Sequence, residues 1–152
     1  MAGTTPHPIL HSTVLRTDTQ TATLAAPPHD VFEFVADPEN LPRWAVGFCR
    51  SIRRDETSAD HWVVTTGTGD IIVRYVTDRA AGVIDFHLSL APGFESVAYS
   101  RVVPNADGAE YIFTQLQPPG MPDEVFEAQV EALREELIVL QALVRARLAC
   151  GT

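Results

Sequence analysis

The chain has 152 residues, of which 45% are hydrophobic and 20% charged, a composition typical of one globular domain with a buried core. Its formal net charge of −9 argues against nucleic acid or an anionic membrane as the main partner, because phosphate binding needs clustered positive charge. All 11 basic residues are arginine. The absence of lysine excludes Schiff-base chemistry, a pyridoxal phosphate anchor and a Gly-Lys-Ser phosphate loop.

The N-terminal segment, residues 1–18, is rich in Thr, Pro and His and has no sustained hydrophobic period. It predicts a flexible arm before a single domain at residues 19–150. The segment has no basic region followed by an apolar stretch, and no apolar run approaches the roughly 20 residues that span a bilayer. A cytoplasmic protein without membrane insertion is therefore expected. No His, Cys and carboxylate set has zinc-like spacing, so we expect neither a metal nor another cofactor.

A strand over "TQTATLAA" is followed by two short helices. "PPHDVFEFVAD" begins with prolines, which suit a helix start, and its apolar residues have helical spacing. Asp37 precedes Pro38, so this helix should end there, and Asp37 can cap a second helix that Pro42 ends. Trp44 then follows the second helix. It is expected either to plug the core at this junction or to cover the mouth of a pocket.

Two hairpins follow, where the hydrophobic period changes to two. A glycine-containing loop at residues 67–70 predicts that Trp62 faces Tyr75, and the turn "RAAG" predicts that Tyr75 faces Phe86. Both registers gather the same apolar set on one face, namely Trp62, Val64, Ile71, Val73, Tyr75, Ile84, Phe86 and Leu88. An antiparallel sheet with one buried face and one wet face is expected.

The next hairpin, "SVAYSRVVPNADGAEYIFTQLQ", has no cleanly apolar face. Arg101 shares a strand face with Tyr99. If that face is the inner one, a guanidinium sits in an apolar cavity, where it suits an enolate, phenolate or carboxylate of a ligand. In the alternative register Arg101 is solvated. On the second strand Tyr111, Phe113 and Gln115 share one face.

The segment "MPDEVFEAQVEALREELIVLQALVRARLAC" predicts a long amphipathic helix of about 27 residues, or about 40 Å. Its apolar stripe recurs at steps of three and four: Phe126, Val130, Leu133, Leu137, Leu140, Val144 and Leu148. Glu131, Glu135 and Glu136 are expected on its solvated side. The order of elements predicts an α+β fold in which a strongly bent antiparallel sheet of about seven strands wraps around this helix.

At this point the chain resembles a known family. "AAPPHDVFEFVADPENLPRWAVG" and "DGAEYIFTQLQ" followed by "PPGMPDEVFEAQVEALREELIVLQALV" are similar to the START-like, helix-grip superfamily, also called SRPBCC or Bet v 1-like. The likeness is greatest to its bacterial polyketide cyclase/dehydrase-like branch. It covers roughly residues 21–148. The motifs serve helix caps, turns and packing, so they indicate the fold more than the function.

The resemblance implies a cavity between sheet and long helix that holds an apolar or aromatic small molecule. A polyketide-like ligand, with cyclase or dehydrase activity, is the leading hypothesis. A non-catalytic carrier or sensor of hydrophobic ligands and a protein-interaction module, such as a chaperone regulator or toxin-like inhibitor, are the alternatives. A homodimer is left open.

The candidate ligand-binding residues are mostly aromatic: Trp44, Trp62, Tyr75, Phe86, Tyr99, Arg101, Tyr111, Phe113 and Gln115. Arg101 is the one candidate for a catalytic role, since it could polarise a carbonyl. For any single aromatic ring, the alternative is ordinary core packing. Cys49 and Ser51 have no base nearby in the sequence, so nucleophilic catalysis is not expected.

Overall fold

The computed structural model describes residues 14–150, which form a seven-stranded antiparallel sheet with one long helix across it. The strands are β1 (Thr17–Leu24), β2 (Ser51–Arg54), β3 (His61–Thr66), β4 (Gly69–Asp78), β5 (Val83–Ala91), β6 (Phe94–Asn105) and β7 (Gly108–Leu116). Their order in the sheet is β1-β7-β6-β5-β4-β3-β2. The predicted arm falls mostly on residues 1–13, outside the described part. Its last two residues already belong to β1.

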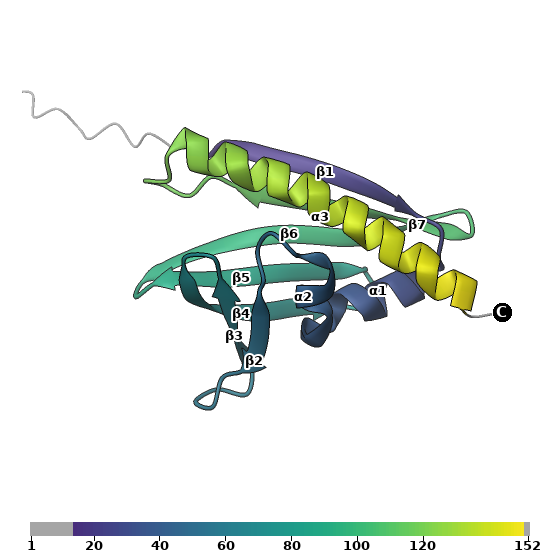
Figure 1. The fold of residues 1–152 in the computed structure, drawn as a ribbon, viewed down its shortest axis with the longest axis horizontal. Helices are drawn as coiled ribbons and strands as arrows, with labels where there is room; N and C mark the ends of the chain where they lie inside the picture. The colour runs from purple at the N-terminus through teal and green to yellow at the C-terminus, as the bar shows by residue number, and fades with distance from the viewer. Residues whose placement is uncertain (1–13, 151–152) are drawn as a thin grey trace, which may run out of the picture.

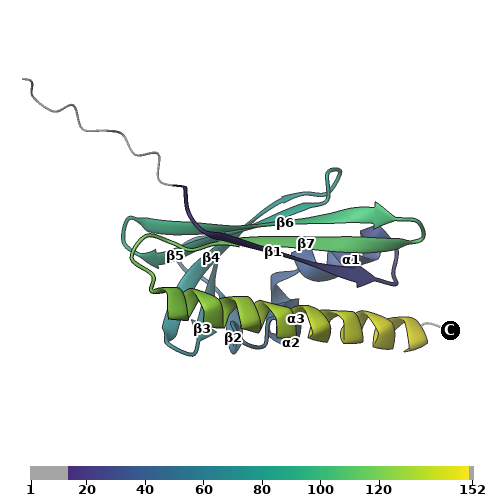
Figure 2. The ribbon, with the colours of Figure 1, turned by 90° about the horizontal axis from the view of Figure 1, so that it is seen from above.

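The long helix α3 (Asp123–Cys150) runs along one face of the sheet (Figures 1 and 2). Helix α1 (Pro28–Ala36) lies toward the C-terminal end of α3. The apolar residues of α3 and the inner residues of the strands form one core. This arrangement confirms the predicted helix-grip fold. None of the helices described is long and apolar enough to cross a membrane.

The prolines of the segment after β1 organise its helices largely as predicted. Pro28 occupies the first turn of α1, and Asp37 is extended and accepts a hydrogen bond from the Glu39 N–H at 3.0 Å. That cap begins a short 3-10 turn, η1 (Pro38–Asn40). Pro42 does not end the helix, however. It lies in the first turn of α2 (Leu41–Trp44), where its missing N–H costs nothing, so Trp44 is part of α2.

The hairpin registers were predicted with one error. Tyr75 faces Phe86 and Val73 faces Leu88, as expected. Trp62 faces Val73, not Tyr75, because the loop between β3 and β4 is only residues 67–68. The register is therefore shifted by two residues. A shift of two leaves each side chain on its predicted face, so the apolar face of the sheet is unchanged.

Strand β6 corrects the prediction for Tyr99 and Arg101. Its buried inner residues are Ala98, Ser100 and Val102, so Tyr99 and Arg101 lie on the outer face. Tyr99 is 48% exposed, and the Arg101 side chain donates from Nε to the Ala81 carbonyl at 3.1 Å. Small side chains on the inner face leave room beside the helix. The alternating pattern gave no sign of this, because the bulky residues of β6 point outward.

Gly82, in the turn between β4 and β5, is expected to tolerate no side chain. Its φ is +72°, and a Cβ there would lie 2.2 Å from the Val102 carbonyl oxygen. We expect Gly82→Ala to lower the free energy of unfolding by roughly 3 kcal/mol, because the backbone of β6 must move. Urea denaturation measures this change.

Gly93 provides the matched control for Gly82. Its φ is +76°, but an added Cβ would meet no atom within 4 Å. Gly93→Ala should therefore cost only the conformational strain, about 1 kcal/mol. Equal losses in the two variants would show that the contact with β6 contributes nothing.

Candidate functional site

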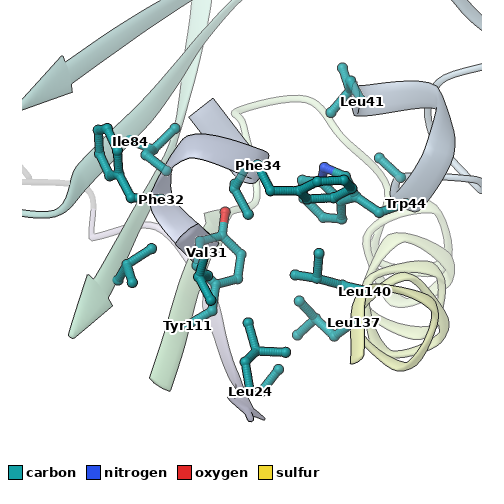
Figure 3. Packing of buried hydrophobic residues seen from close by; sticks show 14 of the residues in the cluster. Leu24, Val31, Phe32, Phe34, Leu41, Trp44, Ile84, Tyr111, Leu137 and Leu140 are labelled. Carbon is teal, nitrogen blue, oxygen red and sulfur yellow. The ribbon is translucent and has the colours of Figure 1, made fainter. Parts of the chain in front are cut away.

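Trp44 is the centre of the packing between the short helices, the sheet and α3. Its side chain is only 2% exposed, and its ring meets the Tyr111 ring edge-on with centroids 6.2 Å apart. Figure 3 shows Trp44 and Tyr111 in one apolar cluster with Leu137 and Leu140 of α3. Trp44 therefore plugs the core, which was one of the two roles left open for it.

A cavity of about 370 Å³ lies between the inner face of the sheet, the segment after α2 and the middle of α3. Its walls are mostly apolar, and they include Leu41, Trp44, Phe48, Ile71, Phe86, Leu88, Ala98, Phe113, Ala132, Leu133 and Glu136. Exposed residues join the lining from the β3–β4 turn, the end of β5 and the first half of α3. These elements lie toward the end of the molecule away from α1 (Figures 1 and 2).

Four of the predicted site residues line this cavity: Trp44, Phe86, Phe113 and Gln115. Trp44 thus forms part of the wall as well as plugging the core. The Phe86 and Phe113 rings lie side by side, with centroids 5.8 Å apart. That these residues bind a ligand remains a prediction.

The other five predicted residues lie outside the lining: Trp62, Tyr75, Tyr99, Arg101 and Tyr111. Trp62 is half-buried near one edge of the sheet, with the Arg54 guanidinium 4.7 Å from its ring centroid. Tyr75 lies behind Phe86, with ring centroids 4.9 Å apart. Tyr111 is fully buried behind Trp44 and Phe113. Burial raises the pKa of Tyr75 and Tyr111 well above the usual range, so both hydroxyls keep their protons.

Gln115 connects the cavity wall to a hydrogen-bond network at the sheet edge. Its side-chain amide donates to Asp18 Oδ2 at 3.0 Å and to the Gln129 carbonyl at 3.5 Å. Gln20 donates to the same Asp18 oxygen at 2.8 Å and to the Val130 carbonyl at 2.9 Å. The network ties β1 and β7 to α3. The N–H groups of Gln115 are thus already engaged by the protein.

Glu136 is the polar cavity residue that sequence analysis placed wrongly. Glu131 and Glu135 are exposed as expected, but Glu136 is only 6% exposed and lines the cavity. The expectation failed because Glu136 was placed on the solvated face of the helix on account of its charge alone. Glu136 follows Leu133 by three positions and precedes Leu140 by four, so helical spacing puts it on the same face as these buried leucines.

The carboxyl group of Glu136 contacts the backbone of the segment that follows α2. The Phe48 N–H donates to Glu136 Oε2 at 3.3 Å, and a Cβ on Gly47 would lie 3.2 Å from the Ala132 Cβ. Burial raises the pKa of Glu136 to about 7, although hydrogen bonds from the Phe48 and Gly47 N–H groups oppose the shift. The group can therefore exchange a proton near neutral pH.

Cys49 is unsuited to nucleophilic chemistry, as expected. The side chain is buried, and its thiol contacts the Ser51 carbonyl at 3.4 Å. Burial raises the pKa of Cys49 to about 11, with a smaller contribution from the Glu136 charge. The thiolate, which is the reactive form, is therefore scarce at neutral pH.

Solved structures share this architecture over most of the chain. The Zhui aromatase/cyclase from Streptomyces sp. R1128 is 20% identical, with a TM-score of 0.70 over 89% of this chain and 96% of that one. A START superfamily protein from Mycobacterium smegmatis is 16% identical, with a TM-score of 0.65 over 86% and 97%. At these identities the likeness shows the fold alone.

A larger protein also contains this fold. The di-domain ARO/CYC BexL from the BE-7585A biosynthetic pathway is 21% identical, with a TM-score of 0.70, and the match covers 86% of this chain and 47% of that one. The present chain thus spans about half of the di-domain protein.

The sequence comparisons place the chain in a family. No curated protein matches it. Residues 17–146, which comprise the whole sheet and most of α3, match the family described as polyketide cyclase / dehydrase and lipid transport. The fold shared with the solved structures agrees with this match. The chain belongs to the polyketide cyclase/dehydrase and lipid transport family.

Proposed function

We propose that this protein binds an apolar or aromatic small molecule in the cavity between the sheet and α3. The observation that carries the proposal is the cavity itself, whose volume of about 370 Å³ falls within the range of small-molecule sites. Its aromatic walls, Trp44, Phe86 and Phe113, suit a flat or folded apolar ligand. A protein-interaction module would need no such space in its core.

A polyketide-like aromatic molecule is the ligand class we favour. The family description combines cyclase and dehydrase activity with lipid transport, and two structural neighbours are named aromatase/cyclases. Arg101 cannot polarise a substrate in the cavity from the outer face of β6. Within residues 14–150, the cavity lining contains one ionisable side chain, that of Glu136. Any cyclisation or dehydration there would take its proton-transfer group from Glu136.

Filling the cavity is expected to abolish binding. Ala98 is buried on the inner face of β6 and lines the cavity, so Ala98→Phe places a ring in the ligand space. We expect the affinity for fluorene, a rigid aromatic hydrocarbon, to fall at least tenfold, because the wall contacts are lost. Titration calorimetry with the full chain measures the affinity, and native mass spectrometry shows whether a molecule co-purifies with the wild type.

Arg101→Ala is the matched control on the same strand. Its side chain lies on the outer face, so fluorene affinity should stay within about twofold of the wild type. Equal fluorene binding by Ala98→Phe and the wild type would exclude the cavity as the binding site. No binding of fluorene by the wild type and no co-purified molecule would contradict the proposed function.

A further inference from the structure

Glu136 is the only ionisable side chain in the cavity lining of residues 14–150. It comes from the middle of α3 and is 6% exposed. One of its oxygens, Oε2, accepts the Phe48 N–H. The backbone of residues 47–48 thus holds the carboxyl group in place against α3, within walls that are otherwise mostly apolar.

The surroundings of Glu136 favour the uncharged acid. No arginine or histidine lines the cavity, and no ion pair to Glu136 occurs within the described residues. The titratable groups that act on it are Cys49, which follows α2, and Glu135, its neighbour on α3. Neither a thiol nor a second carboxylate stabilises the ionised form of Glu136, because neither carries positive charge. The elevated pKa of about 7 agrees with this arrangement, and burial is its largest cause.

A neutral carboxyl group differs from a carboxylate in one respect that matters for binding, because it can donate a hydrogen bond. Among the other donors in the wall, Gln115 already donates to Asp18 and to the Gln129 carbonyl, whereas the Trp44 Nε1–H has no partner within the described residues and does not titrate. The Thr66 hydroxyl donates to the Gly69 carbonyl. In an apolar cavity, a buried O–H needs an acceptor, and a ligand oxygen can supply it.

We propose that Glu136 selects ligands that bear a carbonyl oxygen, which its protonated side chain binds through a hydrogen bond. This inference rests on the proposed function, because it assigns a ligand class to the same cavity. A ligand amine paired with ionised Glu136 is the competing arrangement. It would bury two charges among apolar walls, which costs more than a neutral hydrogen bond.

The test compares 9-fluorenone with fluorene, two molecules of nearly equal shape that differ in one carbonyl group. Wild-type protein is titrated with each at pH 6 and pH 8 by calorimetry. We expect the dissociation constant of 9-fluorenone to rise from pH 6 to pH 8, by at most about tenfold, because the protonated fraction of a group with a pKa of about 7 falls by that factor. The affinity for fluorene should not change with pH.

Three variants assign the effect to one side chain. Glu136→Gln keeps an N–H donor without a titrating proton, so 9-fluorenone should bind with an affinity independent of pH. Glu136→Leu should bind 9-fluorenone no better than fluorene. The exposed neighbour is the control, and Glu135→Gln should retain the wild-type dependence on pH.

The outcomes separate the two proposals. If both probes bind but 9-fluorenone has no advantage at pH 6, or binds more tightly at pH 8, the role of Glu136 is wrong while the cavity stands. If neither probe binds the wild type at either pH, the inference fails, and if no molecule co-purifies with the wild type either, the proposed function fails with it. If a variant does not fold, the comparison of the two probes at pH 6 and pH 8 on the wild-type protein still decides between these outcomes.

Discussion

Trp44→Ala is expected to lower the free energy of unfolding by about 3–5 kcal/mol, as removal of a large aromatic side chain from a core does. The Trp44 ring is 2% exposed and fills the junction between α2, Tyr111 and the leucines of α3. Alanine would leave a void that extends the cavity between the sheet and α3, because Trp44 also forms part of its wall. Urea denaturation followed by far-UV circular dichroism gives the free energy.

Trp62 offers the comparison within the same chain. It is half-buried, lies outside the cavity lining and stacks against the Arg54 guanidinium. Trp62→Ala should therefore cost about 1 kcal/mol, mostly from the lost ring contacts. Equal losses for the two tryptophans would mean that Trp44 is not the plug of this core.

Glu136→Gln is expected to change how stability depends on pH. The folded-state pKa of about 7 lies above the ordinary glutamate pKa of 4.5, so between these two pH values the folded chain holds a proton that the unfolded chain releases. The contribution of Glu136 to the stability of the wild type should thus fall as pH rises from about 4.5 to 7 and then level off. Glutamine has no proton to lose. The stability of the variant relative to wild type should rise by roughly 2–3 kcal/mol between pH 5 and pH 8.

The difference between the two proteins is the quantity to measure, because other carboxyl groups titrate equally in both. Urea denaturation at pH 5, 6, 7 and 8 provides it. Glu135→Gln, at the exposed neighbouring position, should show no comparable trend. A constant difference in the free energy of unfolding between Glu136→Gln and wild type over this range would mean that Glu136 is ionised throughout. Burial would then not raise its pKa.

Local signals in the sequence were sufficient to predict most of the fold. Proline and Asp37 chemistry predicted α1 and the turn after it, because these residues act on the backbone beside them. Alternation predicted the inner face of β3 to β5, where large apolar residues mark that face. Pairing of Tyr75 with Phe86 followed from the length of one tight turn.

The cavity wall was harder to predict for two physical reasons. On β6 the inner face carries Ser96 and Ala98, whose small side chains line the cavity, so a search for bulky apolar residues selects the wrong face. On α3 a carboxyl group takes part in the buried face, and charge suggested solvent exposure. Both features are exceptions to ordinary burial preferences, and such exceptions concentrate where a fold makes room for a ligand.

The position of Trp44 also supplies an optical signal for this site. An indole in the wall should change its emission when a neighbouring void fills, whereas Trp62 lies outside the lining and contributes a background. In a Trp62→Phe protein, Trp44 would be the sole tryptophan of the chain. Its fluorescence would then report on cavity occupancy in unlabelled protein, in a form suited to screening many compounds.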